Sequence, residues 1–206
     1  MKFVGIGGGS GSGKSTLAIS LFKKHPGECA VLHIDDYFKE KPEAPNVGNF
    51  TNWDHPDSVR LDDLYRDILA LKRGEAVIIN TKSELYHPTY DTALKNKMAY
   101  RIEPKSTVIL EGHLAFCDTR IRDLMDLKIY LDAPIEESIK RQSTNRKDFG
   151  REYFDGILAP MHTAFIEPGK KYADMVLDVS AMSREEVLER IESQIFLRDR
   201  PGERMR

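Results

Sequence analysis

The sequence predicts an α/β fold in which a central parallel sheet of about five strands lies between two layers of helices. Two observations predict it. Short apolar segments recur along the chain and end in polar or turn-forming residues, as buried parallel strands do, at residues 3–6, 29–34, 107–112, 127–132 and 174–179. A glycine-rich loop joins the first of them to a segment with apolar residues at helical spacing.

The loop fits the phosphate-binding pattern G-x-x-x-x-G-K-[ST]. Its residues are Gly8, Gly9, Ser10, Gly11, Ser12, Gly13, Lys14 and Ser15, and Thr16 follows. Glycines let successive backbone N–H groups turn toward an anion, and the helix N-terminus adds further donors. Lys14 is expected on the β and γ phosphates and Ser15 on Mg²⁺. A Gly/Ser-rich linker is the alternative, but the strand–loop–helix context favours a P-loop NTPase-type fold.

Bulk composition excludes several classes of protein. The chain of 206 residues suits one domain, 1–206, and its 31 basic and 33 acidic side chains suggest no electrostatic grip on nucleic acid or membrane. Cys29 and Cys117 lack metal-ligand spacing and are expected as buried thiols. Neither a signal peptide nor a membrane helix is expected, so the predicted location is the cytoplasm.

Two acids follow the second predicted strand, in Asp35-Asp36-Tyr37-Phe38. Ligands of open α/β sheets bind beyond the carboxyl ends of the strands, which places a carboxylate there beside the phosphate loop. Asp35 is predicted as general base or as a water-mediated Mg²⁺ ligand. The alternative is a turn or helix-capping role for either acid.

Residues 39–102 are predicted as a small substrate-covering insertion. Residues 39–60 are rich in Pro, Asn and Gly and include Trp53-Asp54-His55, where Trp53 either stacks on a planar ring or plugs the loop onto the body. Residues 61–74 form a core-facing helical pattern that ends at Gly74. Residues 76–79 and 98–102 are predicted as two short strands.

Glu111 ends the strand predicted over residues 107–112, where an acid of a P-loop protein helps to hold Mg²⁺ or its water shell. A purely structural carboxylate is the alternative. Pro134 is expected to open a helix, and the basic residues beyond it suggest a lid over residues 141–155, against the alternative of a solvated surface. Ser183 and Glu186 form a capping box for a final helix to about residue 197, and residues 198–206 are predicted as a frayed tail.

Several stretches together resemble the uridine kinase family of P-loop kinases, up to about residue 180. They are the phosphate loop, Asp35 to Phe38, Asn52-Trp53-Asp54-His55-Pro56-Asp57, Ile109-Leu110-Glu111-Gly112 and residues 165–174. The resemblance implies transfer of a phosphoryl group from ATP or another nucleoside triphosphate, with Mg²⁺, to the 5′-hydroxyl of a nucleoside. It implies that Asp35 is the general base and that Asp54 binds the ribose. It also implies that Ser15 coordinates Mg²⁺ with Glu111 nearby, and that Tyr90 packs against the nucleobase.

Within this scheme the lid cations Arg146 and Arg151, with Lys14, offset the charge of the transferring group. The predicted acceptor-binding residues are Asp36, Tyr37, Phe38, Trp53, Asp54, His55, Tyr90, Arg141 and Gln142. The predicted partners are a nucleoside-like acceptor and a nucleoside triphosphate, with a homo-oligomer as a further expectation.

The sequence departs from uridine kinases where they read the pyrimidine. Thr92-Ala93-Leu94-Lys95 follows Tyr90 in place of a histidine and an aromatic residue, and the lid looks more like that of nicotinamide riboside kinases. A nicotinamide riboside kinase, or a kinase of another alcohol such as pantothenate or a sugar phosphate, is therefore the alternative. A GTP-dependent switch is disfavoured because Asn145-Arg146-Lys147-Asp148 lacks the lysine of the guanine-reading motif.

Overall fold

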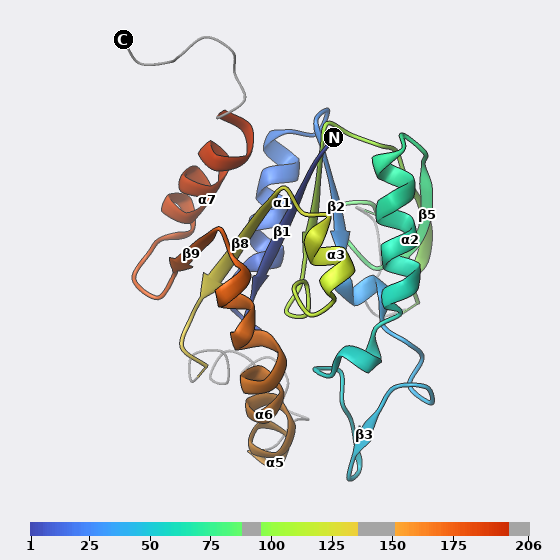
Figure 1. Ribbon diagram of the computed structural model, residues 1–206, viewed down its shortest axis with the longest axis vertical. Coiled ribbons are helices and arrows are strands. Elements are labelled where there is room, and N and C mark those ends of the chain that lie inside the picture. The colour runs from blue at the N-terminus through green and yellow to red at the C-terminus, as the bar shows by residue number, and fades with distance from the viewer. Residues whose placement is uncertain (88–95, 136–150, 198–206) are drawn as a thin grey trace.

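The chain folds around five parallel strands in the order β2-β7-β1-β8-β9 (Figure 1). The computed structural model describes residues 1–87, 96–135 and 151–197. The strands are β1 (Lys2–Gly8), β2 (Cys29–His33), β7 (Thr107–Glu111), β8 (Leu127–Asp132) and β9 (Met175–Asp178). The predicted fold class and all five predicted strands are thus confirmed.

The strand order places a switch point at the carboxyl end of β1. The chain continues toward β7 and β2 on one side of β1 and toward β8 and β9 on the other. Loops that leave neighbouring strands in opposite directions open a crevice at that edge, where open α/β sheets bind their ligands. The phosphate loop follows β1 there, and the loops after β2 and β7 end at the same edge.

Apolar residues of the strands alternate between two core layers. On one face Val4 and Ile6 pack with Leu17 and Leu21 of α1 (Lys14–Lys24) and with Ile191 of α7 (Arg184–Glu192). On the other face a layer forms from α2 (Leu61–Lys72), α3 (Thr119–Asp123) and the strands, with the buried members Phe3, Leu32, Leu64, Ile68 and Ile121. This accounts for the three predicted layers.

The range 39–102 contains both core and cavity elements. It runs through the hairpin β3–β4 (Asn46–Val47 and Phe50–Thr51), the 3-10 helix η2 (Pro56–Ser58), α2 and the antiparallel pair β5–β6 (Val77–Thr81 and Met98–Ile102). The predicted helix ends as expected, with Gly74 at a φ of 82°. Because α2 belongs to the main core, only the segments around it are available to cover a substrate.

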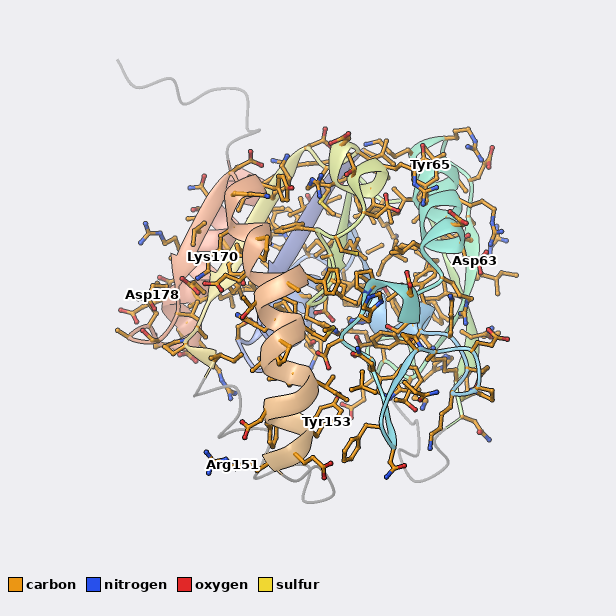
Figure 2. All side chains as sticks on the ribbon, turned by 60° about the horizontal axis from the view of Figure 1, so that its bottom comes forward. Asp63, Tyr65, Arg151, Tyr153, Lys170 and Asp178 are labelled. Carbon is orange, nitrogen blue, oxygen red and sulfur yellow. The ribbon has the colours of Figure 1, made fainter. Side chains whose placement is uncertain are left out.

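A helical run from Arg151 to Tyr172 precedes β9 and combines α, π and 3-10 turns in α5 (Arg151–Tyr153), η4 (Phe154–Leu158), α6 (Ala159–Met161), η5 (His162–Ile166) and η6 (Glu167–Tyr172). Arg151 and Tyr153 lie at its far end from Lys170 (Figure 2). After β9 the Ser183–Glu186 capping box opens α7 as predicted, and a π-helical turn, η7 (Ser193–Leu197), follows.

Several predicted features lie outside the described residues. They are Tyr90, most of the helix expected from Pro134, residues 141–150 of the lid with Arg141, Gln142 and Arg146, the look-alike guanine motif at residues 145–148, and the tail. Cys29 is buried, Cys117 is half-buried, and both are free thiols whose pKa burial raises to about 12. Among the described residues, none of the helices combines the length and apolarity needed to span a bilayer.

Candidate active site

The phosphate loop turns from β1 into α1 through backbone that only glycine adopts readily. Gly8 has a φ of 141°, and a Cβ there would collide with the carbonyl oxygen of Leu131 on β8. Gly13, at a φ of 94°, is the N-cap residue of α1, and within the described residues no side chain caps this helix or places an acid in its first turn. The N-terminal amides of α1 therefore face the crevice without a competing carboxylate.

Lys14 is a buried cation with only neutral partners in hydrogen-bond range. Its Nζ donates to the carbonyl oxygen of Gly9 at 2.6 Å and lies 3.5 Å from Ser12 Oγ. Burial lowers the pKa of Lys14, while the charges of Glu111, Asp35 and Asp54 oppose the shift. No ion pair joins Lys14 to a carboxylate in the described part of the chain. A buried ammonium in this setting suits a polyphosphate, which would supply the missing countercharge.

Glu111 joins the ends of three elements. It ends β7, and its Oε1 accepts from Ser15 Oγ of α1 at 3.0 Å and from His33 Nδ1, at the end of β2, at 2.7 Å. Burial alone would raise the pKa of Glu111, but the His33 hydrogen bond and charge, with Lys14 and Ser15, hold it below the ordinary value. The pKa of His33 is raised overall. Burial by itself would lower it, but the hydrogen bond to Glu111 and the negative charge of Glu111 outweigh the effect of burial.

This arrangement fits Mg²⁺. Ser15 and Glu111 offer a hydroxyl and an ionised carboxylate, the hard oxygen donors that Mg²⁺ prefers, and Mg²⁺ characteristically takes one or two protein ligands together with substrate phosphates and waters. Within the described residues no group of three or more His, Cys, Asp or Glu side chains is arranged to hold a metal by itself. An ion shared with the nucleotide is thus the kind of metal site that these residues suit.

The two acids after β2 face different surroundings. Asp35 is exposed and lines a large cavity, whereas Asp36 is buried and accepts a hydrogen bond from Thr81 of β5. Burial raises the pKa of Asp36, and the Thr81 bond and the charges of His33 and Lys97 oppose it. Both acids belong to the 3-10 helix η1 (Ile34–Tyr37). Of the two, Asp35 has the accessible carboxylate that a general base needs.

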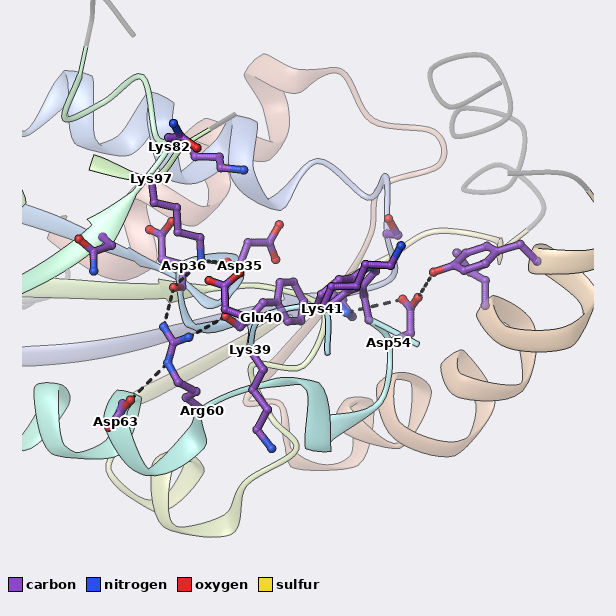
Figure 3. Close-up of a pocket in the computed structure, with 18 residues that line it drawn as sticks. Asp35, Asp36, Lys39, Glu40, Lys41, Asp54, Arg60, Asp63, Lys82 and Lys97 are labelled. Carbon is purple, nitrogen blue, oxygen red and sulfur yellow. Dashed lines mark hydrogen bonds and ion pairs between the residues drawn. The ribbon is translucent and has the colours of Figure 1, made fainter. Parts of the chain in front are cut away.

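The large cavity, about 1950 Å³, lies beside the phosphate loop at Ser10 (Figure 3). Asp54 lies at one end of the view and Asp36, Lys82 and Lys97 at the other. Its walls combine acids, lysines and aromatic rings from the segments after β2, around η2, on the β5–β6 pair and after β7; they include Phe38, Trp53, Asp54, His113 and Tyr153. The rings of Phe38 and Trp53 are 5.5 Å apart.

The predicted acceptor residues divide into two groups. Asp36, Phe38, Trp53 and Asp54 line the large cavity, which brings them together with Asp35. Tyr37 and His55 are not among its lining residues. Tyr37 donates to Asp67 Oδ2 of α2 at 2.9 Å, and His55 Nδ1 accepts from the backbone of Asp57 at 3.1 Å. These contacts give Tyr37 and His55 packing and capping roles.

Arg151, predicted as catalytic, has a side chain that is 92% exposed and pairs with Asp155 one helical turn away. It is not a lining residue of the large cavity in this structure. Its predicted role over the phosphates stays a prediction.

The lining residues that were not predicted as site residues from the sequence include His113, Tyr153 and Lys97. Tyr153 donates to Asp54 Oδ2 at 3.0 Å, and Lys97 donates to the backbone oxygens of Asp35 and Asp36 at 3.1 and 2.7 Å. His113 carried a signal, because it comes two residues after the strand-end acid Glu111. Tyr153 and Lys97 reach the site only through tertiary packing, which no local pattern indicates.

A small cavity of about 710 Å³ lies on the other side of the phosphate loop. Residues 11–17 line it together with apolar and polar residues from the end of β8, the β9–α7 connection and α7, among them Leu131, Val179, Met182 and Arg184. The phosphate loop therefore contributes to the lining of both cavities, with Ser10 at the large one and residues 11–17 at the small one.

Comparison with known proteins agrees with this geometry. A sequence profile of the Phosphoribulokinase / Uridine kinase family matches residues 3–185. The chain belongs to this family. The uridine kinase of Bacillus pumilus is 35% identical over 185 residues, 84% of each chain. That of Chlamydia pneumoniae is 34% identical over 205 residues, 94% of this chain and 88% of the relative.

Solved structures of kinases share the fold. A possible uridine kinase from Bacillus stearothermophilus matches with a TM-score of 0.61 at 21% identity, over 86% of this chain and 88% of its own. Phosphoribulokinase from Rhodobacter spheroides matches with a TM-score of 0.59 at 16% identity, over 89% and 74%. Membership of the Phosphoribulokinase / Uridine kinase family makes the chain a P-loop kinase, a phosphotransferase with an alcohol as acceptor.

Proposed function

We propose that the protein transfers the γ-phosphoryl group of ATP to the 5′-hydroxyl of a ribonucleoside. The observation that carries the proposal is that residues of the phosphate loop line both cavities, with the accessible Asp35 carboxylate on the large one. The donor nucleotide occupies the loop and the small cavity, and the acceptor occupies the large cavity. The names of the uridine kinase relatives support a nucleoside as acceptor.

Catalysis in this scheme comes from positioning and charge neutralisation. The amides of the phosphate loop and the Lys14 ammonium bind the β and γ phosphates. Ser15 and Glu111 hold Mg²⁺, which when bound neutralises charge on the phosphates, and His33 fixes the Glu111 carboxylate through the 2.7 Å bond. Asp35 accepts the proton of the attacking hydroxyl, and Asp54 accepts from a sugar hydroxyl. Trp53 and Phe38 provide ring surface for the base.

The experiment is an acceptor screen that measures ADP release. Purified protein with ATP and Mg²⁺ is given uridine, cytidine and nicotinamide riboside, and in parallel pantothenate and sugar phosphates. The proposal expects ADP release that depends on a ribonucleoside, and phosphorylated product at the 5′ position. If none of the ribonucleosides stimulates ADP release, the proposal is refuted. Tight guanine selectivity with no acceptor-dependent turnover would instead support the nucleotide switch.

A second candidate acceptor is an alcohol that carries an acidic group. Lys39, Lys41 and Lys82 line the large cavity, and none of them forms an ion pair with another described residue. Such lysines suit a carboxylate or phosphate on the acceptor. The same screen tests it, because this candidate expects turnover with pantothenate or a sugar phosphate and none with the ribonucleosides.

A further inference from the structure

Asp54 and His113 form an incomplete hydrogen-bonding pair on the wall of the large cavity. His113 Nε2 lies 3.6 Å from Asp54 Oδ1, which is beyond hydrogen-bond range. The Nε2 atom is buried and has no hydrogen-bond partner in the described part of the chain. The other carboxylate oxygen, Oδ2, already accepts from Tyr153 at 3.0 Å. Among the described residues, Oδ1 and Nε2 are thus the two atoms of the cluster that form no hydrogen bond.

A buried polar atom without a partner costs free energy, and native structures keep few of them. The side chains of both residues belong to the cavity wall and come from separate loops, Asp54 from the segment before η2 and His113 from the segment after β7. A single hydroxyl has one proton to donate and two lone pairs that accept, so it can serve Oδ1 and Nε2 together. A hydrogen or a methyl group at that position of the ligand can serve neither.

We propose that His113 is a specificity residue that, with Asp54, binds one sugar hydroxyl of the acceptor. The hydroxyl donates to Asp54 Oδ1 and accepts from His113 Nε2, while Tyr153 holds Oδ2. The inference rests on the proposed function, because it takes the acceptor to be a ribonucleoside with its 5′-hydroxyl near Asp35. It makes the pocket select ribose over a deoxyribose through His113, a residue outside the predicted acceptor set.

The test combines a change in the protein, at His113, with removal of single hydroxyls from the sugar, in the manner of a double-mutant cycle. We measure kcat/KM of the parent and of His113→Ala on the best ribonucleoside of the screen and on its 2′-deoxy and 3′-deoxy analogues. In the parent, removal of the hydroxyl that the pair binds is expected to lower kcat/KM by about tenfold or more, as for a hydrogen bond to a charged group. In His113→Ala the ribonucleoside is expected to lose kcat/KM while the deoxy analogue loses little, so the ribo-to-deoxy ratio falls by about threefold or more; it stays above one because Asp54 still accepts from the hydroxyl.

Two further variants distinguish a direct hydrogen bond from His113 to the hydroxyl from an indirect role in which His113 only positions Asp54. His113→Gln carries an amide N–H that can replace Nε2–H and is expected to keep most of the ribo-to-deoxy ratio. In an Asp54→Asn background His113→Ala is still expected to lower that ratio, because the histidine touches the hydroxyl itself. A residue that merely holds Asp54 in place would have no effect on the ratio in that background. Thermal unfolding and ATP binding show whether each variant is folded.

The outcomes distinguish the inference from the proposed function. If the parent phosphorylates the ribonucleoside but His113→Ala lowers kcat/KM equally on all three acceptors, the inference is wrong and the proposed function stands. If His113→Ala changes the ribo-to-deoxy ratio in the parent but not in the Asp54→Asn variant, direct contact between His113 and the hydroxyl is refuted. If the parent turns over no ribonucleoside, the proposed function fails, and the inference fails with it.

Discussion

At the scale of single residues, the acid doublet after β2 shows how burial assigns roles to neighbours of identical chemistry. Asp35 is exposed on the large cavity, whereas Asp36 is buried on Thr81 and has a pKa raised by burial. We expect Asp35→Asn to lower kcat by about 10²–10⁴-fold, the range for loss of a general base, because the amide cannot accept the hydroxyl proton. ATP affinity, measured by titration calorimetry, is expected to change little, since the phosphate loop is untouched.

The matched control is Asp36→Asn, which keeps an oxygen for the Thr81 hydrogen bond. It is expected to retain kcat to within about tenfold, because Asp36 is buried in the cavity wall, whereas Asp35 is the exposed acid that can take the proton of the acceptor. Steady-state kinetics on the acceptor from the screen measures both variants. A larger loss in Asp36→Asn than in Asp35→Asn would reverse the assignment of the base.

At the scale of elements, the turn that carries Asp35 is held by two cations from elsewhere in the chain. Lys97 Nζ donates to the backbone oxygens of Asp35 and Asp36, and Arg60 donates to those of Phe38 and Asp36, at 2.8 and 3.4 Å respectively. Lys97 precedes β6 and Arg60 precedes α2. The 3-10 helix η1 is therefore positioned by the β5–β6 pair and by α2 together.

Loss of the Lys97 contact is expected to displace the base without disturbing the nucleotide site. Lys97→Met keeps much of the aliphatic stem but removes the donor, so we expect kcat to fall by about tenfold or more, since small misplacements of a catalytic group are costly. ATP affinity is expected to stay within about threefold of the parent. Lys82→Met is the control, because Lys82 lines the same cavity and, in the described part of the chain, makes no hydrogen bond to η1. Equal losses in the two variants would show that cavity charge, not the turn, matters.

The capping box of α7 offers a prediction about stability alone. Ser183 Oγ accepts from the Glu186 N–H at 3.2 Å, and Glu186 Oε2 accepts from the Ser183 N–H at 2.8 Å. We expect Ser183→Ala to lower the free energy of unfolding by about 1 kcal/mol, the usual cost of a lost N-cap. Chemical denaturation at neutral pH measures it. An unchanged midpoint would mean that packing of Val187 and Ile191 alone holds the helix.

The elements that the sequence predicted are those governed by local pattern. Apolar runs between turn residues predict the five strands, Gly74 and Ser183 mark helix ends, and the glycine loop predicts the strand–loop–helix unit. Local pattern does not report which side chains meet across the cavity. Tyr37, predicted among the acceptor residues, contacts Asp67 of α2 and does not line the large cavity, and its role in acceptor binding stays a prediction. Tyr153 and Lys97 were passed over because their contacts join residues 99 and about 60 positions apart.

At the scale of the whole molecule, a carboxylate at the end of α7 contacts two residues at the end of α1. Glu192, at the end of α7, accepts from Lys24 Nζ at 2.5 Å and from His25 Nε2 at 2.8 Å, and the rings of His25 and Phe196 stack at 3.9 Å. Burial alone would raise the pKa of Glu192, but the two hydrogen bonds and charges lower it from 4.5. This contact ties residues that begin the fold to residues that end it.

Because the pKa of Glu192 is lower in the folded protein, its ionised form stabilises the fold. That contribution is fully present above the unfolded value of 4.5 and is lost as the pH falls through the folded pKa. We expect Glu192→Gln to lower the free energy of unfolding by less than about 1 kcal/mol at pH 7, as for a partly exposed ion pair, and the difference from the parent to vanish at the acid end. Urea denaturation between pH 7 and pH 3 measures both curves. Glu189→Gln, on an exposed turn of the same helix, is the control and should follow the parent throughout. Parallel curves for Glu192→Gln and the parent would show that apolar packing between α1 and α7 holds the two helices together without this carboxylate.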